Sequence, residues 1–258
     1  MFSDLELILT VPPEGAKPTQ ANGLTPAHMA YRVGDGPHLF RAALPTANRG
    51  GYMVIDDVGF NGLGEATPLC HEILRECTAR GFTGVICDFE AKPFQVLVRA
   101  VAQLGELLEK RGWPLLVPEA YAHASDKARV LVSSALSGGS LKQKLADAVE
   151  RYGQSRVVLA VERMALDFYL PSPTGQGAPL TRGELAARME DLAPSVFFSD
   201  ELCAHYFTYM SKQSGAHFIL FDDAGSIRKK LYIARSLGIT AAVLAWPQVD
   251  DILEAVLA

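Results

Sequence analysis

The sequence has no hydrophobic run long enough to cross a membrane. No stretch approaches the ~18 consecutive apolar residues that a membrane-spanning helix needs. The first residues, MFSDLELILTVPP, carry acids and no basic segment, so they do not match a secretory signal peptide. We therefore expect a cytoplasmic protein that has no membrane partner.

Cysteine is scarce, and its spacing excludes the common cysteine motifs. None of Cys70, Cys77, Cys87 and Cys203 lies in a C-x-x-C pair or has the spacing of a zinc site. No pattern among the 6 histidines completes a set of metal ligands. We expect no metal and no cofactor, and a reducing compartment is the simplest setting for the four thiols.

Positive charge is not in excess either. The 24 basic residues are outnumbered by 29 acidic ones, which gives a formal net charge of −5. This balance argues against a nucleic-acid partner. The basic cluster at 228–230 is typical of the solvated face of a helix.

What the sequence does contain is a regular alternation of strand-like and helix-like segments from about Gly50 onward. Its 258 residues are close to the ~250 of a (β/α)8 barrel. Strands are predicted at 52–57, 85–89, 115–118, 130–134, 157–161, 196–198, 218–221 and 241–245. Helices are predicted at 69–80, 96–111, 141–152, 182–189 and 226–237. This order indicates βαβ units and a parallel sheet, so we predict one α/β domain over 1–258, a (β/α)8 TIM barrel.

Three regions depart from the regular pattern. The N-terminal quarter is irregular, with β-like runs near Tyr31 and Phe40 that are either divergent early barrel strands or a hairpin replacing them. Residues 170–181 are rich in proline and glycine, which predicts a surface loop. Residues 205–221 form two β-like runs joined by 211–215, which predicts a β-hairpin inserted before the last helix.

The segment GFTGVICDFE, residues 81–90, places two acids at the end of a buried strand. Asp88 and Glu90 are two residues apart, so their side chains point to the same face. In a closed barrel they lie at the C-terminal mouth, where barrel enzymes carry their active sites. A pair of solvated acids at a strand end is the alternative interpretation.

The same segment resembles the signature strand of family 18 glycoside hydrolases, the chitinase-like barrels. That signature reads Asp-x-x-Asp-x-Asp-x-Glu. Asp88 and Glu90 stand at the third Asp and the catalytic Glu, whereas Thr83 and Ile86 stand at the first two Asp positions. The strand therefore keeps half of the motif acids.

The C-terminal part resembles the closing segment of that family. A hairpin leads to an acidic strand end, a Ser-Ile helix start, a helix with lysine and a last strand that ends in Trp. The matching residues are Asp222, Asp223, Ser226, Ile227, Lys230, Gly238 and Trp246. The resemblance covers roughly 81–246 and is closest to the spore-germination, cortex-lytic subgroup, whose members act on peptidoglycan that contains N-acetylglucosamine.

The resemblance implies substrate-assisted retaining hydrolysis of a glycan that contains N-acetylglucosamine, such as a fragment of peptidoglycan or chitin. Glu90 protonates the glycosidic oxygen, the acetamide oxygen of the sugar attacks the anomeric carbon, and Asp88 holds that acetamide. Trp246 forms the floor of the sugar site, or else it is a core aromatic.

One element of the family site is missing. The family has a tyrosine on the strand two after the acid strand, and the matching run at 130–137 has none, with Ser134 or Ala135 near that position. Tyr121 or Tyr169 is a possible substitute. The missing tyrosine and the two missing motif acids make a second function possible: a catalytically inactive barrel that binds a glycan or a protein.

Further polar residues follow predicted strands and are candidates for the mouth of the barrel. The substrate-binding candidates are Asp56, Asp57, Glu119, Tyr121, Glu162 and Trp246. The turn at 137–140, Ser-Gly-Gly-Ser, precedes a helix and could hold a phosphate. A phospho-sugar or aldolase-like enzyme is therefore a further alternative.

Overall fold

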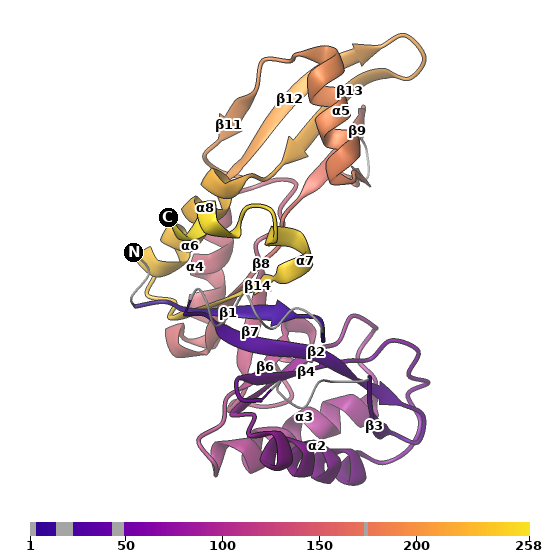
Figure 1. Ribbon diagram of the computed structural model, residues 1–258, viewed down its shortest axis with the longest axis vertical. Helices are drawn as coiled ribbons and strands as arrows, with labels where there is room; N and C mark the ends of the chain where they lie inside the picture. Colours follow the sequence, from indigo (N-terminus) through magenta and orange to yellow (C-terminus); the bar gives the residue numbers. More distant parts are fainter. Residues whose placement is uncertain (1–3, 14–22, 43–48, 173–174) are drawn as a thin grey trace.

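The computed structural model describes residues 4–13, 23–42, 49–172 and 175–258, and its centre is a closed barrel of parallel strands (Figure 1). In order around the barrel, the strands are β1 (Glu6–Val11), β2 (Thr25–Gly34), β4 (Tyr52–Asp56), β5 (Gly84–Asp88), β6 (Leu115–Pro118), β7 (Arg129–Ser133), β8 (Val157–Val161) and β14 (Ala241–Ala245). β14 pairs with β1, and β1 pairs with β2, which closes the ring. The predicted TIM barrel is confirmed.

Alternation along the strands separates two apolar regions. One set of side chains fills the barrel interior: Ile8, Ala27, Tyr52, Val54, Ile86, Leu116, Val158 and Ala241. The residues between them face outward, into apolar layers beneath the helices. The strands are buried on both sides, which explains why β8 has the uninterrupted apolar sequence VVLAV.

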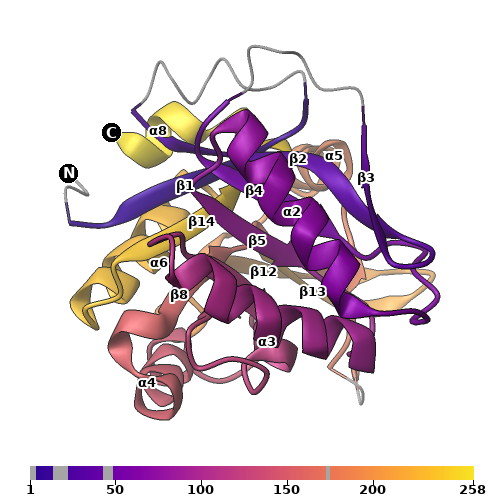
Figure 2. The same ribbon diagram turned by 90° about the horizontal axis from the view of Figure 1, so that it is seen from below.

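Helices α2 (Ala66–Arg80), α3 (Gln95–Glu109), α4 (Leu141–Tyr152) and α6 (Ala224–Ser236) cover the outside of the barrel (Figure 2). α2 ends at Gly81, whose φ of 69° suits the left-handed conformation of a helix end. α6 begins after Asp223, whose side chain accepts a hydrogen bond of 2.8 Å from the backbone N–H of Ser226. Short helices α7 (Trp246–Val249) and α8 (Leu253–Leu257) follow β14.

The N-terminal quarter combines both structures that its sequence suggested. β2 is a barrel strand, and β3 (His38–Arg41) pairs with it antiparallel as a hairpin. β1 was not predicted, although it completes the barrel. Between β6 and β7 the chain makes one 3-10 turn, Glu119–Tyr121, where a regular barrel would have a helix.

A second sheet is inserted between β8 and α6, and we call residues 165–221 the inserted lobe. It contains β9 (Ala165–Leu170), β10 (Ala178–Pro179), α5 (Arg182–Leu192), β11 (Phe197–Ser199), β12 (Ala204–Ser211) and β13 (Gly215–Phe221). The five strands are antiparallel in the order β10-β9-β13-β12-β11, and the sheet stands beyond the barrel (Figure 1).

The predicted hairpin is confirmed as β12 and β13, but one neighbouring prediction was wrong and another was incomplete. The segments at 196–198 and 218–221 are not barrel strands, because β11 and β13 each pair antiparallel with β12 in the second sheet. The proline-rich segment at 170–181 is not only loop, since β10 pairs there with β9. One domain over 1–258 stays a prediction.

A buried polar cluster joins the inserted lobe to the barrel. The Lys230 ammonium lies 2.7 Å from Asp222, and both side chains are fully buried. Asp222 also accepts hydrogen bonds from the Ser226 hydroxyl at 2.7 Å and from the backbone N–H of Met164 at 2.9 Å. The carboxylate therefore connects α6 with the segment where the chain leaves β8.

Candidate active site

Asp88 and Glu90 lie at the C-terminal end of β5. Asp88 is in register with Asp56 at the end of the neighbouring strand β4. Ile86, two residues before Asp88, is part of the barrel interior, so Asp88 faces the mouth above it. Glu90 is exposed, and its backbone N–H donates a 3.0 Å hydrogen bond to Asp57.

The mouth concentrates negative charge. The pKa of the Asp88 carboxyl is raised, first because the surrounding protein reduces its solvation and then because Glu90, Asp56, Asp57 and Glu162 repel its charge. The side chain is still accessible to solvent through the mouth. Asp88 therefore keeps a proton to higher pH than an ordinary aspartate, which suits a group that shares a proton with Glu90 or donates a hydrogen bond to a substrate.

The raised pKa of Asp88 also predicts a stability effect. Because its pKa is higher in the folded chain than in the unfolded one, ionisation of Asp88 weakens the fold as pH rises through the folded pKa. Asp88→Asn should therefore raise the melting temperature at neutral pH, and the gain should shrink as the pH falls below the folded pKa. Thermal unfolding of both proteins at several pH values measures this. A stabilisation that grows on acidification would contradict the assignment.

Asp57 and Tyr121 lie behind the strand ends, on the helix side of the barrel. Asp57 is 3% exposed, and Tyr121 is fully buried with its ring 5.3 Å from that of Phe89. Among the described residues, the second Asp57 oxygen has no hydrogen-bond partner. Burial, together with the Asp57 charge, raises the pKa of Tyr121 to about 12. Asp57 thus supports the backbone of Glu90, and Tyr121 packs beneath the site.

Glu162 follows β8 and Glu119 follows β6, and the two residues border different hollows. The backbone N–H of Glu162 donates to the hydroxyl of buried Ser134 at 3.0 Å, and Glu162 is close enough to raise the pKa of Asp88. Glu119 instead borders a hollow of about 350 Å³ at the start of α4. That hollow borders the turn at 137–140. There the Ser140 hydroxyl accepts a hydrogen bond of 3.4 Å from the backbone N–H of Gln143 and so caps the start of α4.

Trp246 is half-buried and packs on the apolar layer between the barrel and its C-terminal helices. The alternation along β14 places Val243, rather than Leu244, toward the barrel interior. A sugar-floor role for Trp246 therefore stays a prediction. Tyr169 lies toward the far end of β9, opposite His217, and β7 ends in Ser133 without a tyrosine.

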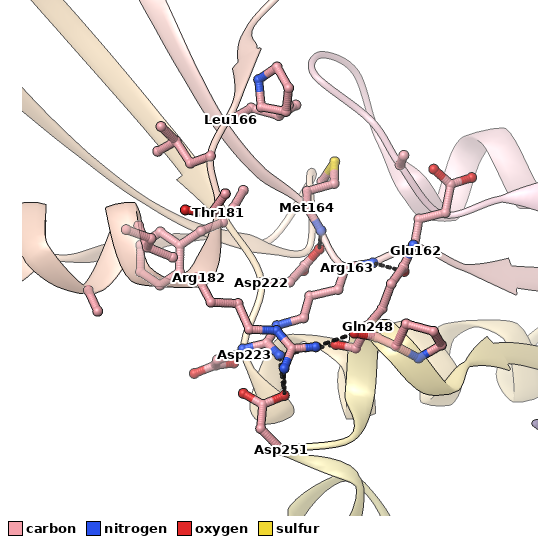
Figure 3. A pocket seen from close by; sticks show the side chains of 18 of the residues that line it. Glu162, Arg163, Met164, Leu166, Thr181, Arg182, Asp222, Asp223, Gln248 and Asp251 are labelled. Atoms are coloured by element: carbon pink, nitrogen blue, oxygen red, sulfur yellow. Dashed lines mark hydrogen bonds and ion pairs between the residues drawn. The ribbon is translucent and has the colours of Figure 1, made fainter. Parts of the chain in front are cut away.

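A cavity of about 870 Å³ lies beside the mouth, between the barrel and the inserted lobe (Figure 3). We call it the lobe cleft. Of the predicted site residues, it includes Glu162. Its other walls come from β9, α5, the end of β13 and the segment after β14. The sequence did not reveal this cleft, because no single motif contains its walls.

In the described part of the chain, no group of three or more His, Cys, Asp or Glu side chains is placed to hold a metal ion. Within the same residues, no helix is both long and apolar enough to span a bilayer.

Comparison with known proteins was made at the level of both sequence and structure. The sequence matches no protein-family model and no curated protein. Solved structures do match. A chitinase from Chromobacterium violaceum superposes with a TM-score of 0.70 at 16% identity, covering 96% of this chain and 97% of the other. The family 18 N-acetylglucosaminidase of Paenibacillus barengoltzii gives a TM-score of 0.68 at 14% identity. The match covers 98% of this chain and 99% of the other.

The spore cortex-lytic enzyme SleL of Bacillus megaterium gives a TM-score of 0.64 at 16% identity, covering 93% of this chain and 70% of that one. The fold is that of the chitinase-like family 18 barrels. The predicted resemblance to this family is thus confirmed at the level of the fold. In the family 18 fold of this chain, β5 is the fourth barrel strand; Asp88 is its last residue, and Glu90 follows two residues later.

Proposed function

We propose that this protein is a retaining glycosidase that acts on glycans containing N-acetylglucosamine, with Glu90 as the general acid and Asp88 as its partner. The observation that carries the proposal is the position of both acids at the mouth of a barrel with the family 18 fold. The solved structures of that fold named above are a chitinase, an N-acetylglucosaminidase and a cortex-lytic enzyme.

The chemistry assigned to each residue follows from its surroundings. Glu90 is exposed, so it can reach a glycosidic oxygen above the mouth and give it a proton. The acetamide oxygen of the sugar then attacks the anomeric carbon, and water completes the hydrolysis with Glu90 acting as base. Asp88, which has a raised pKa, holds the acetamide during the attack. Asp57 fixes the backbone that presents Glu90.

A second candidate function is a catalytically inactive barrel that binds glycans, and Ile86 favours it. The family signature has a carboxylate at this position, whereas Ile86 is 2% exposed within the apolar interior and lies below Asp88 on the same face. The Ile86 side chain cannot exchange a proton with Asp88, as a carboxylate at this position could. The phospho-sugar alternative has less support, because the Ser140 hydroxyl already caps α4.

Calorimetric titration with chito-oligosaccharides, run beside an assay for released sugar, distinguishes these functions. A glycosidase binds and releases product, whereas an inactive glycan-binding barrel binds without product. If the protein does neither with chito-oligosaccharides or with peptidoglycan fragments, both carbohydrate functions are wrong. In the same assay, Glu150→Gln is the control for Glu90→Gln, because it also removes one negative charge but at an exposed position on α4.

A further inference from the structure

Much of the wall that the inserted lobe supplies to the lobe cleft is aliphatic. It is built by Leu166 from β9, Leu180 just after β10, and Leu185 and Met189 from α5. All four side chains are only partly buried. α5 has no fully buried residue, although Leu185 and Met189 contact the apolar cluster on the sheet. Apolar side chains of this helix are therefore accessible from the cleft, whereas in an ordinary core they would be covered.

The rest of the lining is more polar, and its two guanidinium groups are already paired. The Arg163 guanidinium lies 2.6 Å from Asp251 and donates to the backbone carbonyl of Gln248 at 3.1 Å (Figure 3). Arg182, from the inserted lobe, forms ion pairs with Asp250 at 2.6 Å and Asp251 at 3.2 Å. Each guanidinium has a carboxylate partner, so the cleft is not built to recruit an anionic ligand.

The lobe cleft also lacks an aromatic surface for a sugar ring. Phe221 is the one aromatic residue among those that line it, and its exposure is 7%. Sugar rings gain from stacking on an exposed aromatic face, whereas aliphatic walls favour aliphatic ligands. Each methylene removed from water contributes about a fourfold gain in affinity. The walls thus favour a hydrocarbon chain over a second sugar.

Glu162 connects the lobe cleft to the mouth of the barrel. It directly follows the C-terminal end of β8, which is part of the mouth, and it also lines the cleft. A ligand whose sugar lies above Asp88 can therefore extend past Glu162 into the cleft. A cavity of about 870 Å³ is in the size range of small-molecule sites.

We propose that the lobe cleft binds an aliphatic chain attached to the sugar, so that the preferred ligand is an N-acetylglucosaminide with a hydrocarbon substituent. The sugar end of this proposal rests on the proposed function. The chain end rests on Leu166, Leu180, Leu185 and Met189 alone.

The test is calorimetric titration of Glu90→Gln with the methyl, butyl and octyl β-glycosides of N-acetylglucosamine, below the concentrations at which they form micelles. Affinity should rise from methyl to butyl by about fourfold per methylene and rise again to octyl. Leu185→Asn should remove most of this gain. Leu192→Asn should keep it, because Leu192 is 41% exposed on the same helix and does not line the cleft. If Leu185→Asn fails to fold, Met189→Gln replaces it.

Equal affinity for the three glycosides would overturn the inference, as would equal loss in the Leu185 and Leu192 variants. Octyl β-glucoside, which lacks the acetamide, separates this inference from the proposed function. If it binds with the same dependence on Leu185 while the wild-type protein releases no sugar from chito-oligosaccharides, the chain site stands and the glycosidase proposal fails. If the wild type hydrolyses chito-oligosaccharides and chain length has no effect, the inference fails and the glycosidase proposal stands.

Discussion

Glu90→Gln should lower the turnover of a chito-oligosaccharide by about 10²- to 10⁴-fold, the usual contribution of a positioned general acid. Glutamine has nearly the same size and still accepts hydrogen bonds, but it has no proton of suitable acidity to give to the leaving oxygen. The backbone N–H at position 90 keeps its bond to Asp57, so the local fold should be unchanged. The loss should appear in kcat, with KM altered little.

Steady-state kinetics on the wild type, Glu90→Gln and the surface control Glu150→Gln measure this effect. The control should keep wild-type kinetics, because its side chain is exposed on α4. Turnover of Glu90→Gln within a fewfold of the wild type would remove Glu90 from the chemistry. A leaving group that needs no protonation, such as 4-nitrophenolate, should reduce the defect relative to a natural sugar, because the acid then contributes less.

Lys230→Met should destabilise the protein by about 3–5 kcal/mol, since it leaves the fully buried Asp222 carboxylate without its counter-charge. The hydroxyl of Ser226 and the N–H of Met164 still donate to Asp222, but neither carries a charge. Equilibrium unfolding in urea measures the difference in free energy. Because Asp222 joins α6 to the start of the inserted lobe, the lobe should loosen with the rest of the protein.

The neighbouring lysine provides a matched control. Lys229 forms an ion pair with Asp200 on the surface, where the two side chains are 42% and 84% exposed. Lys229→Met should therefore cost about 1 kcal/mol or less. The double variant Asp222→Asn with Lys230→Met should recover part of the loss, because it removes the isolated charge. Equal stability of the two lysine variants would contradict a structural role for the buried pair.

The regular part of the barrel could be predicted from the sequence because local periodicity and burial agree there. The predicted bounds of β6, α4, β8 and β14 match the structure, and those of β5 and α3 differ by one or two residues. Strand alternation also correctly indicated that Asp88 would lie at the end of a buried strand. Each of these features depends on residues that are close together in the sequence, within one helix or strand.

The remaining features depend on partners far away in the chain. The run at 196–198 has the composition of a barrel strand, and only its antiparallel pairing with β12 places it in the second sheet. β1 is joined to β14 across nearly the whole sequence. The lobe cleft brings together Glu162, Leu185 and Asp251, which no sequence motif relates.

The two ends of the inserted lobe are themselves neighbours. Ala165 and Phe221 face each other in register, and the N–H of Asp222 donates to the carbonyl of Met164 at 2.8 Å. The chain thus leaves and re-enters the barrel through a single rung of hydrogen bonds. For the connection between β8 and α6, the lobe is equivalent to a tight turn, so its size or sequence can change without altering the register of any barrel strand. The choice of ligand could then diverge while the acid pair on β5 stays where it is.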